Sequence, residues 1–262
     1  MTTGLRKGEL EDVFSYPISD SKSKNKLFIL SLITLASFFI PLAPWFILYG
    51  YMLQIERDLV QTGRLELPEW TNWGRFLVDG AKATGIVLLY NLPLILLILV
   101  GFVVVFIPGF LLAGGESLEI VDSSPWAVIL AGIVTLGGFV GFSLMMIIAI
   151  GLNFILPAAV THFAVQGQFK AAFRMHEVLA IVRRNFYDYL IAYVILVVIS
   201  IFSALIVQIL SLTIVLCVLI PFIQSAISAY TLLLYAGLFA KAYRGGLEKY
   251  QSEKQTEMGE EA

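Results

Sequence analysis

Few residues of this chain have the type and spacing that catalysis or metal binding requires. His176 and Glu177 begin like the His-Glu-x-x-His helix of zinc proteases, but Ala180 stands where the second histidine ligand belongs. His162 follows Thr161 at the end of an apolar stretch, which favours an interfacial or pore-facing side chain over a metal ligand. We therefore expect no metal site.

Other catalytic signatures are missing from the sequence as well. It contains no Gly-x-Ser-x-Gly elbow, no Walker loop and no Cys-x-x-Cys pair. Glu69 and Asp79 are ten residues apart and do not form an evident acid–base dyad. The single cysteine, Cys217, lies in an apolar run and is expected to pack as a small hydrophobic side chain. We expect no catalytic residues and no cofactor, so the protein is predicted not to be an enzyme.

The composition indicates a membrane protein. Hydrophobic residues make up 59% of the 262 residues and charged residues only 14%, and the mean hydropathy is +0.88. Such a chain has too few charged side chains to cover a water-soluble globule. Charge is missing altogether from four long runs: residues 27–55, 83–115, 123–169 and 189–240. Each run exceeds the roughly 20 residues that cross a bilayer as a helix.

The pattern predicts an all-α bundle with four spanning helices, at residues 83–113, 125–163, 189–211 and 217–243. These helices and a preceding segment at residues 27–56 form a single membrane domain, residues 27–243. Residues 1–26 are expected to be a flexible cytoplasmic tail, and the acidic residues 244–262 a disordered one.

Two interpretations are open for residues 27–56. Pro41 and Pro44 interrupt the apolar run, because each proline removes a backbone donor and clashes with the preceding turn. Lysines precede the run and arginines follow it. A re-entrant hairpin keeps both basic flanks in the cytoplasm, whereas a fifth, kinked crossing places the N-terminus outside.

Orientation follows from the basic residues, which collect in cytoplasmic loops. Residues 54–82, residues 164–188 and the tail from Lys241 each hold four Lys or Arg residues. The connector at residues 114–124 and the turn near residues 211–221 hold none. The C-terminus is therefore predicted to be cytoplasmic, and with the hairpin the N-terminus is cytoplasmic too.

The two larger cytoplasmic segments are predicted to be interfacial. Residues 64–82 read as an extended strap followed by a helix anchored by tryptophans, and residues 168–187 as an amphipathic helix. On the second segment, the candidate lipid-headgroup contacts are Lys170, Arg174, Arg183 and Arg184. The alternative is an ordinary amphipathic helix packed against its own bundle.

A series of residues resembles the pattern of a known family. The series comprises Gly50, Tyr51, Arg57, Pro68, Glu69, Trp70, Phe76, Gly80, Tyr90, Pro93, Phe173, Asn185 and Tyr189, with Trp73 as a further interface candidate. It resembles a prokaryotic membrane-protein family, the domain of unknown function 4013, over residues 14–243. The resemblance implies a multi-helix bundle in a bacterial or archaeal plasma (inner) membrane, and it implies no activity.

Two function classes follow from these patterns. We expect a scaffold or accessory subunit that engages lipid or a membrane-protein partner through its interfacial helices, with no nucleic-acid partner. The alternative is a permease or lipid-handling protein with a polar path near Asn91, Asn153, Gln208 and Gln224. The Gly137-x-x-x-Gly141 step is a candidate surface for helix packing, within the bundle or in a homo-oligomer.

Overall fold

The computed structural model describes residues 5, 7–40, 42–113, 125–212 and 218–260, and every regular element in these ranges is a helix. The predicted all-α fold is confirmed. The chain divides into two compact units: a large unit, Met1–Ile86 with Pro157–Ala262, and a small unit, Val87–Leu156. The acidic connector and Cys217 lie outside the described residues.

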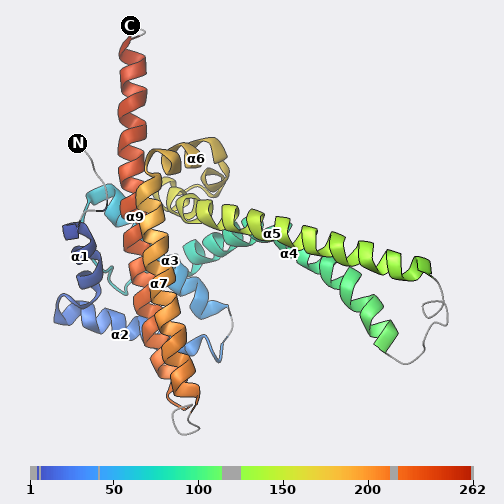
Figure 1. The fold of residues 1–262 in the computed structure, drawn as a ribbon. Coiled ribbons are helices and arrows are strands. Elements are labelled where there is room, and N and C mark those ends of the chain that lie inside the picture. Colours follow the sequence, from blue (N-terminus) through green and yellow to red (C-terminus); the bar gives the residue numbers. More distant parts are fainter. Residues whose placement is uncertain (1–4, 6, 41, 114–124, 213–217, 261–262) are drawn as a thin grey trace. The chain divides into compact units, whose positions relative to one another are not determined.

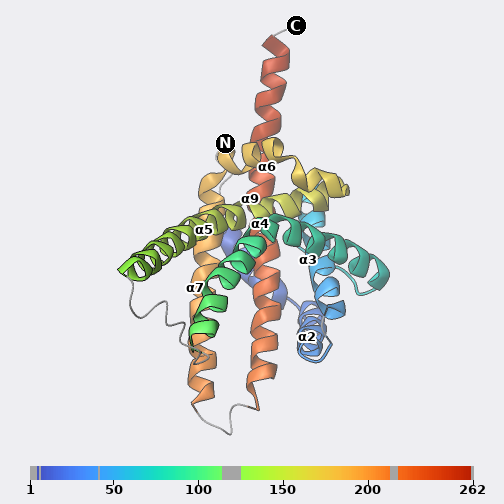
Figure 2. The ribbon, with the colours of Figure 1, turned by 90° about the vertical axis from the view of Figure 1, so that its right-hand side faces the viewer.

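The large unit is built around α9 (Ile220–Glu260). The helices that pack most extensively against it are α1 (Lys7–Ser15), α2 (Ser21–Ala36), α3 (Ala43–Thr62), α6 (Met175–Arg184) and α7 (Phe186–Ser211). Figures 1 and 2 both show α7 running alongside α9. The buried positions of α9 include several alanines, among them Ala229, Ala236 and Ala240. Small side chains let neighbouring backbones approach closely, so α9 can hold several helices at once.

Four helices are long and apolar enough to cross a membrane. The candidate spans are Trp73–Leu99, Leu136–Gln166, Phe186–Ser211 and Ile220–Thr256. Large apolar side chains cover their outer surfaces; Phe139, for example, is 70% exposed. An apolar surface of this extent is stable only in lipid. The protein is therefore a membrane protein with four candidate crossings.

Two of these spans belong to longer helices, α4 (Trp73–Ala113) and α5 (Pro125–Gln166), which run from one unit into the other. Residues 63–69 before α4 have no regular secondary structure and form the strap. The helix that follows is not a separate interfacial element, because α4 continues without a break from Trp73 into the span. After α5 comes a short 3-10 helix, η2 (Phe169–Phe173), which leads to α6.

The first apolar run is broken where the prolines predict. Helix α2 ends at Ala36, and α3 starts at Ala43 with Pro44 in its first turn. Proline is well tolerated there because the first-turn amides have no helical partner. Neither helix is among the four candidate spans. Whether this pair re-enters or crosses stays a prediction at this point.

The N-terminal segment differs from the expected flexible tail. Described residues 7–26 form α1, a 3-10 helix η1 (Tyr16–Ile18) and the start of α2. Val13 is buried against Gly237 of α9, and the Tyr16 hydroxyl donates to the carbonyl oxygen of Leu233 at 2.6 Å. The charged residues of this segment suggested a solvated tail, but its few apolar side chains fix it to α9.

The C-terminal segment also differs from the expected disorder. Helix α9 runs on to Glu260. Arg244 pairs with Glu248 one turn later at 3.0 Å, and Arg184 of α6 pairs with Glu253 at 2.7 Å. The first pair supports the helix locally, and the second ties it to α6.

Candidate functional site

The family-like series begins with two glycines at which α3 and α4 meet. A Cβ atom added to Gly50 would collide with the carbonyl group of Phe76, and one added to Gly80 would collide with that of Phe46. Each glycine thus lies against the backbone of the other helix. Only a residue without a side chain allows this approach.

Aromatic rings close the same junction on the strap side. Tyr51 of α3 stacks on Trp70 of the strap, with ring centroids 4.1 Å apart and an angle of 9° between the planes. Trp73 stacks on the other side of this cluster, 5.1 Å from Trp70, and Phe76 meets Tyr51 edge-on at 5.6 Å. The Tyr51 hydroxyl donates to the carbonyl oxygen of Pro68 at 3.0 Å. These residues fasten the strap to α3.

The strap is also tied to α2. The Lys26 ammonium lies 2.7 Å from a carboxyl oxygen of Glu69 and donates to the carbonyl oxygen of Leu67, also at 2.7 Å. Glu69 is mostly exposed, so the ion pair itself contributes little, but the bond to the backbone fixes the position of Lys26. The motif residues of the strap therefore connect α2, α3 and α4.

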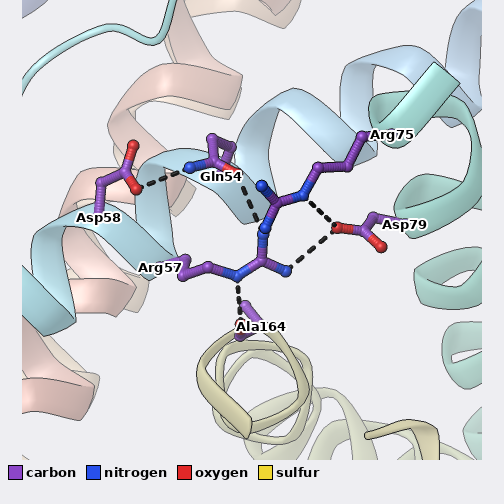
Figure 3. Close-up of polar contacts among 6 residues, drawn as sticks. All are labelled: Gln54, Arg57, Asp58, Arg75, Asp79 and Ala164. Carbon is purple, nitrogen blue, oxygen red and sulfur yellow. Dashed lines mark hydrogen bonds and ion pairs between the residues drawn. The ribbon is translucent and has the colours of Figure 1, made fainter. Parts of the chain in front are cut away.

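Arg57 is the centre of a polar network that reaches three helices (Figure 3). Its Nε donates to the carbonyl oxygen of Ala164 at 2.7 Å, and its terminal nitrogens reach Gln54 Oε1 at 3.0 Å and Asp79 Oδ2 at 3.1 Å. Arg75 lies 3.6 Å from the same oxygen of Asp79. Ala164 is in the last turn of α5, where carbonyl groups have no helical partner. A guanidinium satisfies such a carbonyl and matches the negative end of the helix dipole.

Glu56, next to Arg57 in the sequence, is buried in the large unit. It is 0% exposed, and neither carboxyl oxygen makes a hydrogen bond within the described structure. Burial raises the pKa of Glu56 to about 8. The Thr161 hydroxyl opposes this shift, but its own proton goes to the carbonyl oxygen of Pro157 at 2.9 Å. Such a group holds its proton to higher pH than an exposed glutamic acid does.

His162 lies in the core near the end of α5. Its Nδ1 is 2.6 Å from the Tyr243 hydroxyl of α9, and its Nε2 is 3.3 Å from a carboxyl oxygen of Glu177 on α6. The ring therefore connects three helices, in place of the interfacial or pore-facing position expected from the sequence. Among the described residues, no group of three His, Cys, Asp or Glu side chains could hold a metal ion.

Asn185 and Tyr189 fix the start of α7 on α9. The Asn185 amide donates to the carbonyl oxygen of Ala242 at 2.8 Å and to Asp188 at 2.6 Å, and its oxygen accepts from Lys249 at 2.8 Å. Tyr189 is buried, and its ring lies 6.0 Å from that of Phe239. These family-like residues also hold helices together.

The four candidate headgroup contacts lie in different surroundings. On its inner face, α6 buries Val178, Ile181 and Val182, and it packs closely on α9 at Gly246. Its apolar face therefore meets the bundle. The basic residues point elsewhere: Arg184 pairs with Glu253 and Arg174 lies 3.6 Å from Glu177, whereas Lys170 and Arg183 are exposed without a described ion pair.

The remaining candidates lie in α4, α5, α7 and α9. Tyr90 and Pro93 belong to the small unit, where Tyr90 is buried and Pro93 exposed. Cβ atoms added to Gly137 or Gly141 would meet nothing within 4 Å. The amides of Asn91 and Asn153 donate to carbonyl groups one turn earlier in their own helices. Gln224 donates weakly to Ser228 of α9, at 3.3 Å.

Comparisons with known proteins identify the family alone. No curated protein and no solved structure matches the chain. The sequence profile of one family, described as "Protein of unknown function (DUF4013)", matches residues 33–212. The match covers more than half of the chain, including the α3–α4 junction and the start of α7. The protein therefore belongs to the DUF4013 family, as its motif residues predict.

Proposed function

We propose that the protein is a non-enzymatic scaffold or accessory subunit of a prokaryotic plasma (inner) membrane, and that one cytoplasmic surface contacts lipid headgroups. This interfacial surface consists of exposed aromatic, apolar and basic residues around α6: Phe169, Lys170, Phe173, Arg174, Met175, Arg183, Phe186 and Tyr187. A membrane-protein partner or a second copy would bind elsewhere on the helices.

The exposure of these side chains is the observation that carries the proposal. Tyr187 is 77% exposed at the start of α7, while the opposite side of the segment is anchored by Val178 and Ile181 in the core. Part of each of these aromatic rings therefore lies outside the bundle. Aromatic residues favour the membrane–water boundary, and each nearby Lys or Arg adds about 1 kcal/mol of attraction to an anionic leaflet.

Contacts near both chain ends support cytoplasmic termini. The Leu5 amide donates to Asp188 at 3.0 Å, and Lys241 donates to the carbonyl oxygen of Glu9 at 2.8 Å. The N-terminal residues thus lie at the same ends of α7 and α9 as the predicted cytoplasmic segments. Arg57 in turn bonds Ala164, at the end of α5 that the basic residues also assign to the cytoplasm. The chain between Glu9 and Arg57 then begins and ends on the cytoplasmic side of the membrane, which favours the re-entrant hairpin.

The family motif supports a structural role over transport or catalysis. Gly50, Tyr51, Arg57 and Asn185 are all engaged in contacts between helices of this chain. These residues therefore serve to position segments of this chain, and the surface proposed for lipid contact is the one around α6.

Spin-label accessibility in the reconstituted full-length protein tests the proposal. A label at Tyr187 should be shielded from a water-soluble nickel relaxant in nanodiscs with anionic lipid, whereas a label at exposed Ser252 of α9 should stay accessible. Arg183→Glu should reduce the shielding at Tyr187, and the matched reversal Lys254→Glu should not. Equal accessibility at the two labelled positions, with or without anionic lipid, would overturn the proposal.

A further inference from the structure

The carboxyl group of Glu56 has no described function in holding helices together, unlike its neighbour Arg57. It is fully buried on α3, and it interacts electrostatically with residues of four other elements. Thr161 of α5 faces it, and its charge would act on the phenols of Tyr16 in η1, Tyr189 in α7 and Tyr235 in α9. No basic side chain is among the groups that act on Glu56.

These surroundings favour one protonation state. The hydroxyl of Thr161 and that of Tyr16 both donate to backbone carbonyl groups, of Pro157 and Leu233. A carboxylate at this point would be buried without a cation, and the Thr161 hydroxyl could donate to it only by giving up its bond to the Pro157 carbonyl. An uncompensated buried charge is among the most costly features a folded protein can contain, and such a group becomes neutral instead.

We propose that Glu56 is a proton-binding site: the neutral acid allows α3 to pack against α9, and loss of the proton loosens this packing. The consequence reaches further than Glu56, because α3 also carries Tyr51 and Arg57. Loosening α3 would therefore disturb the strap and the carbonyl contact with Ala164. The bound ligand is a single proton, and protonation adds no other chemical step.

The position of Glu56 in α3 agrees with this role. Leu48, Met52, Ile55 and Leu59 are buried along the same helix, and Glu56 occupies a buried position of that stripe. An acid on an apolar stripe is destabilising as long as it is charged. As a neutral side chain it fits the core, so the proton decides whether α3 can dock.

Infrared spectroscopy of the full-length protein in detergent tests the site directly. The carbonyl stretch of a protonated carboxyl group should be visible at pH 7, should titrate away at alkaline pH and should be missing in Glu56→Gln. Asp188→Asn, which changes another buried but hydrogen-bonded acid, should leave the band in place.

Two results would overturn the proposal. One is a wild-type spectrum without such a band at pH 6 and above. The other is a band that Glu56→Gln retains. If Glu56→Gln does not fold, titration of the wild-type protein still tests the proposal. Disappearance of the infrared band below pH 6 would mean that the carboxyl group holds no proton at neutral pH.

Discussion

The guanidinium of Arg57 donates to the backbone carbonyl of Ala164 over 2.7 Å, although the two residues are 107 positions apart in the chain. This one contact joins α3 to the last turn of α5, and the same side chain holds Asp79 of α4. A single motif residue thus fixes the ends of three helices.

Replacing Arg57 should destabilise this junction strongly. Arg57→Ala leaves Asp79 and the Ala164 carbonyl without their donor, and we expect the free energy of unfolding to fall by about 2–4 kcal/mol. Arg57→Lys should recover only part of it, because an ammonium cannot reproduce the planar fork. Denaturant unfolding in detergent micelles measures the loss.

Arg75 provides the matched control. It is 52% exposed and makes one longer contact with Asp79, so Arg75→Ala should cost less than about 1 kcal/mol. Equal losses for the two arginines would mean that the carbonyl contact with Ala164 has no special weight.

The glycines at the α3–α4 junction should tolerate no side chain. A methyl group at Gly50 or Gly80 meets backbone atoms of the facing helix, which cannot move away as a side chain can. We expect Gly50→Ala and Gly80→Ala to reduce the yield of monodisperse protein severely. Gly74→Ala, in the same helix as Gly80 but with nothing within 4 Å, should behave like the wild type. Size-exclusion chromatography after detergent extraction compares the three variants, and wild-type yields of all three would refute the close approach.

Stability should depend on pH through Glu56. Its pKa is raised from 4.5 to about 8 in the folded protein, so the unfolded chain loses this proton first as the pH rises. The bound proton of Glu56 contributes fully to the free energy of unfolding below pH 4.5. This contribution is lost between pH 4.5 and about 8, at about 1.4 kcal/mol per pH unit. Thermal unfolding midpoints should fall across this window in the wild type and much less in Glu56→Gln. Glu69→Gln, at an exposed acid, should keep the wild-type slope.

Substitutions at Gly137 and Gly141 should not destabilise a single chain. Because an added Cβ meets nothing within 4 Å, Gly141→Ala should leave the stability of the monomer unchanged or slightly higher. If these glycines pack against a second copy, Gly141→Ile should reduce the oligomer size in detergent. Light scattering distinguishes the cases, and an unchanged mass for Gly141→Ile removes the dimer interpretation.

The membrane architecture could be predicted from the sequence because charge and proline act locally. The uncharged runs predict four crossings, and Pro44 lies in the first turn of α3, where the chain resumes after the break that follows α2. The tails could not be predicted in the same way. Val13 and Tyr16 are isolated apolar residues in a charged segment, and only the surface of α9 shows where they bind.

The sequence indicated the motif residues, but not how they contact one another and not the role of Glu56 beside Arg57. The series from Gly50 to Gly80 carries the junction, yet its partners Asp79, Ala164 and Phe46 follow no pattern. Glu56 was missed. Its position on the buried helical stripe with Met52 and Leu59 was the available signal, but its charge suggested a cytoplasmic flank.

Cysteine labelling in intact cells tests the central claim, that the surface around α6 and the N-terminal segment both face the cytoplasm. In a Cys217→Ser background, single cysteines at exposed Ser252, next to the Glu253 that pairs with α6, and at exposed Glu11 should react with a membrane-impermeant maleimide only after the cells are permeabilised. Labelling of Ser252→Cys from outside intact cells would contradict the account. Labelling of Glu11→Cys from outside would contradict the hairpin.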